Sequence, residues 1–198
     1  GRAIGEEARF REKDVILGPG LNMYRSPLCG RNFEYMGEDP FLAGKMAVPY
    51  IQALQKNGVA ACLKHYACNN EERYRHKTDV EVDERALREI YLPAFEIAVK
   101  EGGAQTVMAA YNLFRGTHCC HNGYLINDIL KGEWGFEGLV MSDCFSAYDC
   151  GLLAENMMLS AWSMGVGSIC LGSPVRFLTD NEECVPCLAK LGFSEGYE

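Results

Sequence analysis

The sequence contains no apolar run that approaches the ~20 residues needed for a membrane-spanning helix. It also contains no cluster of basic residues, because its 19 Lys and Arg residues are scattered among 27 acidic ones. The first absence argues against a membrane partner, and the second argues against nucleic acid as a partner. With a formal net charge of −8, the chain is better suited to neutral or cationic small substrates.

The chain also lacks an initiating methionine. It starts at Gly1 with the charged segment GRAIGEEARFREKD, so we expect a fragment without its natural start. Its 198 residues suffice for one domain with a substantial core. They fall short of the ~250 residues typical of a complete (β/α)8 barrel. The lack of a signal peptide is then uninformative, and a bacterial periplasmic or a cytoplasmic location fits equally well.

Cysteine, in contrast, is abundant, with ten residues. Those in or beside apolar runs are expected to be buried free thiols: Cys62, Cys68 and Cys170. Cys184 and Cys187 form a C-x-x-C pair, which supplies only half of the four ligands of a structural zinc site. The tetrad 118–121 (HCCH) has metal-binding residue types, but neighbouring side chains point apart. A metal there and a vicinal Cys119–Cys120 disulfide remain alternatives, and the prediction is that the chain holds no metal.

Segment 138–144 (GLVMSDC) is the most informative part of the sequence. A short apolar run ends abruptly in Ser142 and Asp143, which is typical of a buried parallel strand with a carboxylate at its C-terminal end. In barrel enzymes the loops that follow the strands build the active site. A carboxylate at that position can attack a sugar carbon as a nucleophile. The alternative is that Asp143 caps a helix or lies in a solvated loop.

Three other segments combine an apolar run with polar residues that follow it: 15–25 (VILGPGLNMYR), 59–69 (VAACLKHYACN) and 105–112 (QTVMAAYN). They present Asn22 and Arg25, Lys64 and His65, and Tyr111 and Asn112, respectively. Helical patterns separate these segments, so the sequence predicts βα units around one shared site. The expected fold class is therefore α/β.

Three helices are predicted between the strands: from Asp39-Pro40 to Gly58, from Asp83 to Gly102-Gly103, and at 125–130 ahead of Gly135. Asp39 and Asp83 are the expected N-caps, and Pro49 is expected to kink the first helix. The chain changes character near residue 147, since residues 151–198 carry two basic residues against six acidic ones. In this tail we predict helices at 152–164 and 180–191 and a strand at 168–171, and we place a domain boundary between 1–147 and 148–198.

Several separated motifs along residues 15–146 resemble the family 3 glycoside hydrolases of the β-glucosidase type: GPGLNMYRSPLCGRNFEYMGEDP, CLKHYACNNE, VDERALREIYLPAFEIAVK, VMAAYN and EWGFEGLVMSD. The resemblance implies a partial (β/α)8 TIM-like barrel, which here would carry an atypical α/β tail. It also implies hydrolysis of terminal β-D-glycosidic bonds by a retaining double displacement. It implies Asp143 as nucleophile, no cofactor, and a β-linked oligosaccharide or aryl glycoside as substrate. It leaves the oligomeric state open.

The same resemblance implies six substrate-binding residues: Arg31, Lys64, His65, Arg75, His76 and Tyr111. Lys64 and His65 form the KH motif and would bind glycone hydroxyl groups. Arg31, from GRNFE, and Tyr111, from AAYN, would line the same subsite, while the remaining two match a further basic pair nearby. Charged donors can keep a nearby carboxylate ionised and bind hydroxyl groups through charge-assisted hydrogen bonds. Ordinary surface and packing roles are the alternative.

Three departures from the family pattern limit the expected activity. One substrate-binding Asp belongs to a segment upstream of Gly1, and the acid/base Glu belongs to a second domain for which no motif is present. Cys144 follows the nucleophile, as in the xylosidase branch, where β-glucosidases usually carry Trp, whereas GRNFE resembles the glucosidase branch. We therefore expect impaired activity, with glucose and xylose both open as the glycone.

Two tail segments, YDCGLLAENMMLSAWSMGVGSICLGSP and LAKLGFSEGYE, are similar to the C-terminal part of flavin-dependent nitroreductases over residues 148–198. That resemblance implies FMN as the cofactor. The basic residues that hold the flavin phosphate and most of that fold's sheet are absent from the sequence, so we expect no FMN binding. The alternative function is an FMN-dependent nitroreductase-type oxidoreductase fragment or a non-catalytic remnant.

Overall fold

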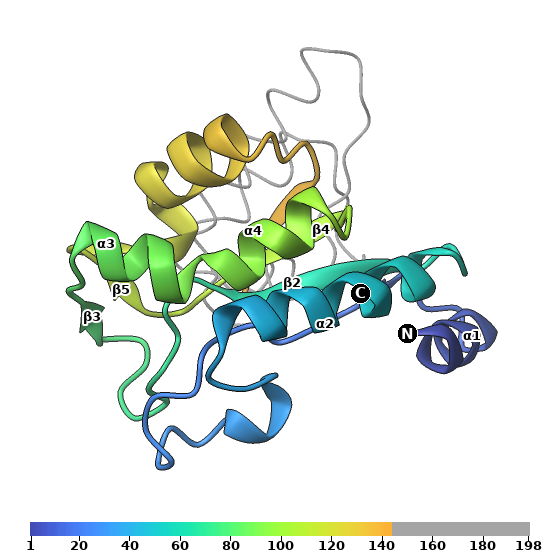
Figure 1. Ribbon diagram of the computed structural model, residues 1–198, viewed down its shortest axis with the longest axis horizontal. Helices are drawn as coiled ribbons and strands as arrows, with labels where there is room; N and C mark the ends of the chain where they lie inside the picture. The colour runs from blue at the N-terminus through green and yellow to red at the C-terminus, as the bar shows by residue number, and fades with distance from the viewer. Residues whose placement is uncertain (144–198) are drawn as a thin grey trace, which may run out of the picture. The chain divides into compact units, whose positions relative to one another are not determined.

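A four-stranded parallel sheet forms the centre of the computed structural model, which describes residues 1–143 (Figure 1). Its strands lie in the order β1 (Val15–Ile16), β2 (Ala60–Tyr66), β4 (Thr106–Ala109) and β7 (Leu139–Ser142). Val107 of β4 pairs with Leu63 of β2 on one side and with Val140 of β7 on the other. Each strand comes from one of the four apolar runs, which confirms the predicted α/β fold of a partial barrel.

The two middle strands are buried, which explains why their sequences are almost continuously apolar. Every residue of β4 is buried, and Cys62 and Leu63 of β2 are fully inaccessible to solvent. Cys62 is a free thiol as predicted, and burial raises the pKa of its thiol to about 11. Strand β7 ends the order of the described sheet and is more open, with Leu139 48% exposed.

Helix α2 (Pro40–Gln55) begins as predicted. The Asp39 carboxylate accepts a hydrogen bond from the Leu42 N–H at 2.8 Å, and proline occupies the first turn, where its missing N–H costs nothing. Pro49 lies inside the helix. The predicted stop is also present, because Gly58 adopts a φ of +71°, a left-handed conformation that favours glycine.

Helices α2 and α4 (Pro93–Lys100) pack together in front of β2 and β4 (Figure 1). Their approach is close at Gly44, where an added Cβ would lie 2.8 Å from the Ile97 Cδ1 atom. Glycine therefore permits the helix contact that covers this face of the sheet. Helix α1 (Arg2–Phe10) packs against α2.

The second predicted helix is interrupted, which corrects the expectation of one continuous helix from Asp83. The Asp83 carboxylate caps α3 (Glu84–Ala86) by accepting from the Ala86 N–H at 2.9 Å. A π-helical turn, η2 (Leu87–Tyr91), follows, and α4 starts afresh at Pro93. Proline has no N–H to continue the hydrogen bonds of the preceding turn, so the chain restarts its helix there.

The third amphipathic stretch forms the π-helical segment η4 (Tyr124–Glu133), which buries Leu125 and Ile129 as predicted. A small second sheet was not predicted, because each of its strands has only two residues: β3 (Asp79–Val80), β5 (Leu113–Phe114) and β6 (Thr117–His118). Two short 3-10 turns, η1 (Asn32–Glu34) and η3 (Cys119–His121), complete the described elements. Figure 1 shows β3, α3 and β5 close together on the side of the described residues towards which β2 runs.

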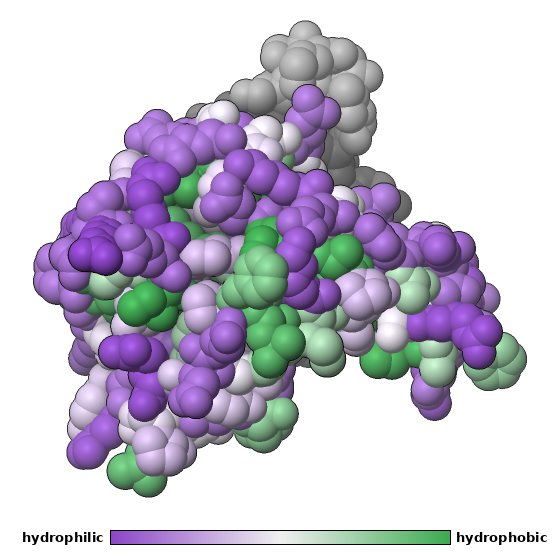
Figure 2. All heavy atoms as spheres, in the orientation of Figure 1, coloured by the Kyte–Doolittle hydropathy of each residue, from purple (hydrophilic) through white to green (hydrophobic). Residues whose placement is uncertain are grey.

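The face formed by α2 and α4 carries hydrophobic residues in its middle and hydrophilic ones around them (Figure 2). On α2 the exposed apolar side chains are Phe41, Leu42 and Met46. Within residues 1–143, no helix is both long and apolar enough to cross a membrane.

The remaining cysteine predictions divide between the described residues and the tail. Cys68 is a buried free thiol, as predicted. Cys119 and Cys120 are both buried and free, so the alternative of a vicinal disulfide is wrong. The predicted helices and strand of the tail lie outside the described residues, as do Cys144 and the three cysteines of the tail named above: Cys170, Cys184 and Cys187.

Candidate active site

Three strand ends meet at one edge of the parallel sheet. Lys64 and His65 lie at the end of β2, Tyr111 follows β4, and Asp143 follows β7. The Asp143 N–H donates to the Ala109 carbonyl at 3.2 Å, which ties the end of β7 to the end of β4. Asp143 is only 9% exposed. The C-terminal ends of parallel strands thus gather these side chains, as the barrel architecture requires.

The side chain of His65 lies beside Asp143, with 3.6 Å between His65 Nε2 and Asp143 Oδ2. Two hydrogen bonds from Asn22, in the loop after β1, hold the His65 backbone: Oδ1 accepts from its N–H at 2.8 Å and Nδ2 donates to its carbonyl at 2.9 Å. The His65 side chain is almost completely buried. Burial, and then the positive charges of Arg31 and Lys64, lower the pKa of His65 to about 2, so its imidazole is neutral.

Glu34 contacts two of the residues predicted to bind the sugar, Lys64 and Arg31. Its carboxylate lies 2.7 Å from Lys64 Nζ and also accepts a hydrogen bond from Arg31 Nε. The three side chains are between 14% and 20% exposed. Burial, the largest single influence, lowers the pKa of Arg31, but Glu34 together with Tyr35 and Glu72 outweighs it and leaves that pKa raised. Glu34 therefore fixes both cations in one place.

Glu72 plays the matching role on the other side of the site. One of its carboxylate oxygens accepts from Arg75 at 2.7 Å, and the other accepts from Asn69 Nδ2 at 3.0 Å. The second oxygen also lies 3.7 Å from Arg31. The Arg75 guanidinium sits over the Tyr111 ring, 4.3 Å from its centroid. Glu72 thereby links Arg31 to Arg75 and Tyr111.

His76 completes the set of predicted residues. Its ring centroid lies 4.4 Å from that of Tyr111. Both residues of the basic pair, Arg75 and His76, therefore contact the tyrosine of the AAYN motif. The structure thus brings the predicted binding residues into one cluster around Glu34 and Glu72 and places Asp143 next to His65. Sequence reasoning did not assign roles to these two glutamates or to Tyr35 and Asn69. A signal was available for Glu34 and Tyr35, which lie in or next to the quoted GRNFE motif.

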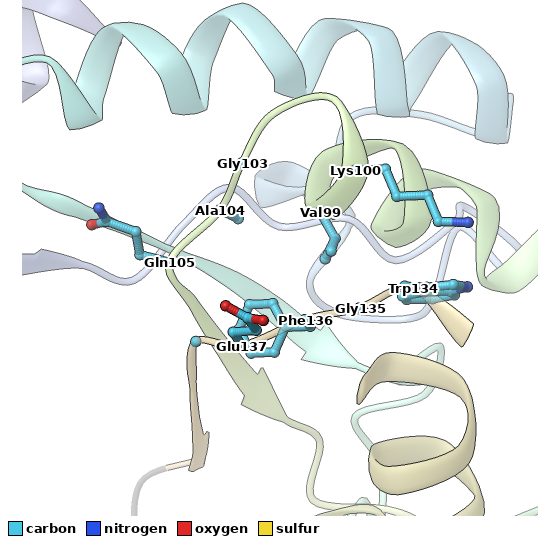
Figure 3. A pocket seen from close by; sticks show the side chains of 10 residues that line it. Val99, Lys100, Gly103, Ala104, Gln105, Trp134, Gly135, Phe136 and Glu137 are labelled. Carbon is cyan, nitrogen blue, oxygen red and sulfur yellow. The ribbon is translucent and has the colours of Figure 1, made fainter. Parts of the chain in front are cut away.

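A separate hollow of about 450 Å³ lies at the opposite end of the strands. The connections that lead into β4 and β7 line it, and Figure 3 shows Val99 pointing towards Trp134 and Phe136 across it. Because the polar cluster follows the other ends of the same strands, this hollow is not part of the candidate site. Among residues 1–143, no three His, Cys, Asp or Glu side chains are grouped so that they could hold a metal ion.

Comparisons with known proteins agree with this geometry. The model of the glycosyl hydrolase family 3 N terminal domain matches residues 1–165. Beta-glucosidase BoGH3A of Bacteroides ovatus is 64% identical over 149 residues, which are 75% of this chain and 20% of that protein. An exo-alpha-(1->6)-L-arabinopyranosidase of Bifidobacterium breve is 48% identical over 151 residues, with 76% of this chain and 20% of that protein covered.

A solved structure shares the fold. Beta-glucosidase 3B from Thermotoga neapolitana, determined in complex with glucose, matches with a TM-score of 0.71 and 53% sequence identity. The match covers 72% of this chain and 20% of that one. The chain therefore spans about a fifth of the length of these relatives. Since the family model matches most of its residues, the chain belongs to glycosyl hydrolase family 3 through the N-terminal domain of that family.

Proposed function

We propose that residues 1–143 carry the nucleophile side of a retaining glycosidase site that acts on terminal β-D-glycosidic bonds. The observation that carries the proposal is the Asp143 carboxylate at the mouth of the strands, 3.6 Å from the neutral His65 ring. One Asp143 oxygen would bond to the anomeric carbon while the glycosidic C–O bond breaks and the leaving oxygen takes the electron pair. Water would then hydrolyse the glycosyl ester and release the sugar.

Sugar binding is proposed for the six residues of the cluster: Arg31, Lys64, His65, Arg75, His76 and Tyr111. Lys64 has three N–H donors and uses one of them on Glu34, so others can bind hydroxyl groups. Glu34 holds Lys64 and Arg31 in position before the sugar arrives, which reduces the entropy lost on binding. The transition state resembles an oxocarbenium ion, and a neutral His65 adds no opposing positive charge beside it.

The proposed substrate class is a β-linked oligosaccharide or aryl glycoside with a terminal glucose or xylose. Its support is that relatives matching this chain are named as β-glucosidases, one of them solved with glucose. Another relative is named as an arabinopyranosidase, so the relatives of this chain are not all named for the same sugar. Cationic nitrogens such as those of Lys64 and Arg31 can donate charge-assisted hydrogen bonds to the hydroxyl groups of such a sugar.

We further propose that this chain has weak turnover on its own. The sequence contains no motif for the acid/base residue, and the two carboxylates of the cluster already form ion pairs, Glu34 with Lys64 and Glu72 with Arg75. A positioned acid contributes ~10²–10⁴-fold, with the greatest effect on leaving groups that need a proton. Poor leaving groups such as the sugar of cellobiose should therefore react very slowly.

A trapping experiment on the 198-residue chain tests the nucleophile without the acid. The probe is 2,4-dinitrophenyl 2-deoxy-2-fluoro-β-D-glucoside, because dinitrophenolate leaves without protonation and the fluorine slows hydrolysis of the ester. We expect a covalent adduct that peptide mass spectrometry locates on Asp143 and that Asp143→Asn abolishes. An adduct on another carboxylate would refute the assignment of Asp143. Efficient cellobiose cleavage would refute weak turnover.

For the tail we propose that residues 148–198 form a separate C-terminal part of nitroreductase-like character that does not bind FMN. The acidic composition of residues 151–198 supports a separate part, and the relatives align over about three quarters of the chain. The family model extends further, to residue 165. Flavin fluorescence titration tests the cofactor prediction, and saturable binding at micromolar FMN would overturn it.

A further inference from the structure

A chain of hydrogen bonds behind His65 connects the two halves of the site. It starts at Glu72, whose carboxylate oxygens accept from Arg75 at 2.7 Å and from Asn69 Nδ2 at 3.0 Å. A carboxylate held by a guanidinium can only accept hydrogen bonds. The Asn69 group that faces Glu72 must therefore be its NH₂, and this fixes the orientation of the Asn69 amide.

The next link is Tyr35. Asn69 Nδ2 also donates to the Tyr35 hydroxyl oxygen at 3.3 Å. Tyr35 is 5% exposed and Asn69 is 1% exposed, so water does not compete for these groups. Because the Tyr35 oxygen accepts from Asn69, its own proton is directed to its other neighbour, the Nδ1 atom of His65 at 3.1 Å.

The last link is His65. A neutral imidazole has one nitrogen with a proton and one without. Burial, followed by the nearby Arg31 and Lys64 charges, keeps His65 neutral. If Nδ1 accepts from Tyr35, the proton sits on Nε2, the atom that lies 3.6 Å from Asp143 Oδ2. The opposite tautomer would turn an Nε2 lone pair towards a carboxylate, so both ends of the chain favour the same proton position.

We propose that Tyr35, oriented by Asn69 and Glu72, is a positioning residue that locks His65 as the Nε2–H tautomer, with that N–H directed into the site beside Asp143. The inference rests on the proposed function for its purpose, since an N–H in that place can hold the nucleophile or a sugar hydroxyl in line. Its geometry does not depend on any sugar. The carboxylate–amide–phenol order also explains why three side chains from two separate loops lie together behind one histidine.

The test is the tautomer itself. The chain has four histidines, and ¹⁵N-histidine labelling gives each ring nitrogen a characteristic long-range ¹H–¹⁵N signal. His65→Gln assigns the His65 signals by their disappearance. In the unaltered chain at neutral pH we expect a pyridine-type Nδ1 and a pyrrole-type Nε2. A pyrrole-type Nδ1, or an imidazolium pattern, would overturn the proposal without any variant.

Tyr35→Phe sharpens the test, because it removes the hydroxyl and keeps the ring. We expect the His65 spectrum to shift to a mixture of tautomers, and labelling of Asp143 by the fluoro-glucoside to slow by roughly 2- to 10-fold. Tyr24→Phe is the matched control, since its hydroxyl donates to the Tyr35 backbone carbonyl at 3.0 Å rather than to His65. It should leave the tautomer unchanged.

The outcomes separate this inference from the proposed function. An unchanged His65 tautomer in a folded Tyr35→Phe chain would overturn the role of Tyr35. If that variant does not fold, as judged by far-UV circular dichroism, Asn69→Ala probes the same link and should produce a partial shift. If the tautomer behaves as expected but no adduct forms on Asp143, the positioning network stands and the glycosidase proposal fails.

Discussion

Two groups of ion pairs in residues 1–143 use the same side-chain types in opposite settings. The strand-end cluster consists of Arg31, Glu34, Lys64, Glu72 and Arg75, and its side chains are between 14% and 29% exposed. The helix-surface network consists of Glu84, Arg88, Arg115, Tyr124 and Glu133, and its charged side chains are between 35% and 45% exposed. Burial is the physical difference between them.

The helix-surface network ties elements together. Arg88 donates to Glu84 on α3, to Glu133 at 2.6 Å and to Tyr124, both on η4. Hydrogen bonds from Tyr124 and then Arg88 lower the pKa of Glu84 to about 2. In the strand-end cluster, by contrast, Lys64 has donors beyond the one that Glu34 engages. Paired charges at the surface thus hold two elements together, whereas the charge pair of Lys64 leaves N–H donors that the proposed sugar could use.

The largest expected effect comes from breaking the strand-end cluster at Glu34. Glu34→Gln would leave Arg31 and Lys64 partly buried without their carboxylate. Removing one partner of a buried pair strands the other charge, so we expect the free energy of unfolding to fall by about 3 kcal/mol. Urea denaturation measures this as a lower midpoint at unchanged slope. A loss no greater than that of a surface pair would show that water screens the cluster.

The second prediction concerns the contribution of Lys64 to sugar binding. Lys64→Met should reduce the rate of Asp143 labelling by the fluoro-glucoside by roughly 10- to 100-fold, because a charge-assisted hydrogen bond to the sugar is lost. Lys45→Met is the matched control, since Lys45 forms an exposed pair with Glu101 at 2.6 Å. Equal labelling rates in the two variants would remove Lys64 from the binding residues.

The third prediction uses pH and the buried His65. Its pKa is lowered in the folded chain to about 2, so below its ordinary value the unfolded chain binds a proton that the folded chain does not. The unfolding free energy must then fall as the pH falls, by about 1.4 kcal/mol between about pH 7.5 and 5.5. Urea titrations at the two pH values measure the difference.

Two histidine variants control the pH prediction. His65→Gln should remove this contribution, while His121→Gln, at an exposed position, should retain it. If the unfolding free energy of the His65→Gln chain keeps the full pH dependence, then groups other than the buried, neutral His65 cause that dependence.

The smallest expected effect comes from the helix-surface network. Glu133→Gln removes one of several partners of Arg88, and exposed ion pairs contribute ~0–1 kcal/mol. The loss in urea midpoint should therefore be a small fraction of the Glu34→Gln effect and should shrink further in high salt. A loss as large as that of Glu34→Gln would erase the distinction between the two groups.

Local sequence patterns predicted most of the strands and helix starts of the described fold. The four strands follow from continuous apolar runs, and Asp39 and Asp83 cap helices where their spacing indicates. The break at Pro93 was missed because the apolar face continues across it. The sheet of β3, β5 and β6 was missed because strands of two residues are too short to show a repeating hydrophobic pattern in the sequence.

By itself the sequence determined the parallel strands, the polar residues that end them and the place of Asp143 at a strand end, because continuous apolar runs indicate buried strands and the helices between them indicate parallel pairing. Only the tertiary structure decided which of those residues touch. Glu34 meets Lys64, and Tyr35 meets His65, across about thirty residues of chain. Such pairs depend on how loops from different βα units are placed over the sheet, and no local periodicity encodes that placement. The partners, and with them the charge state and proton position of His65, therefore arise only in the folded chain.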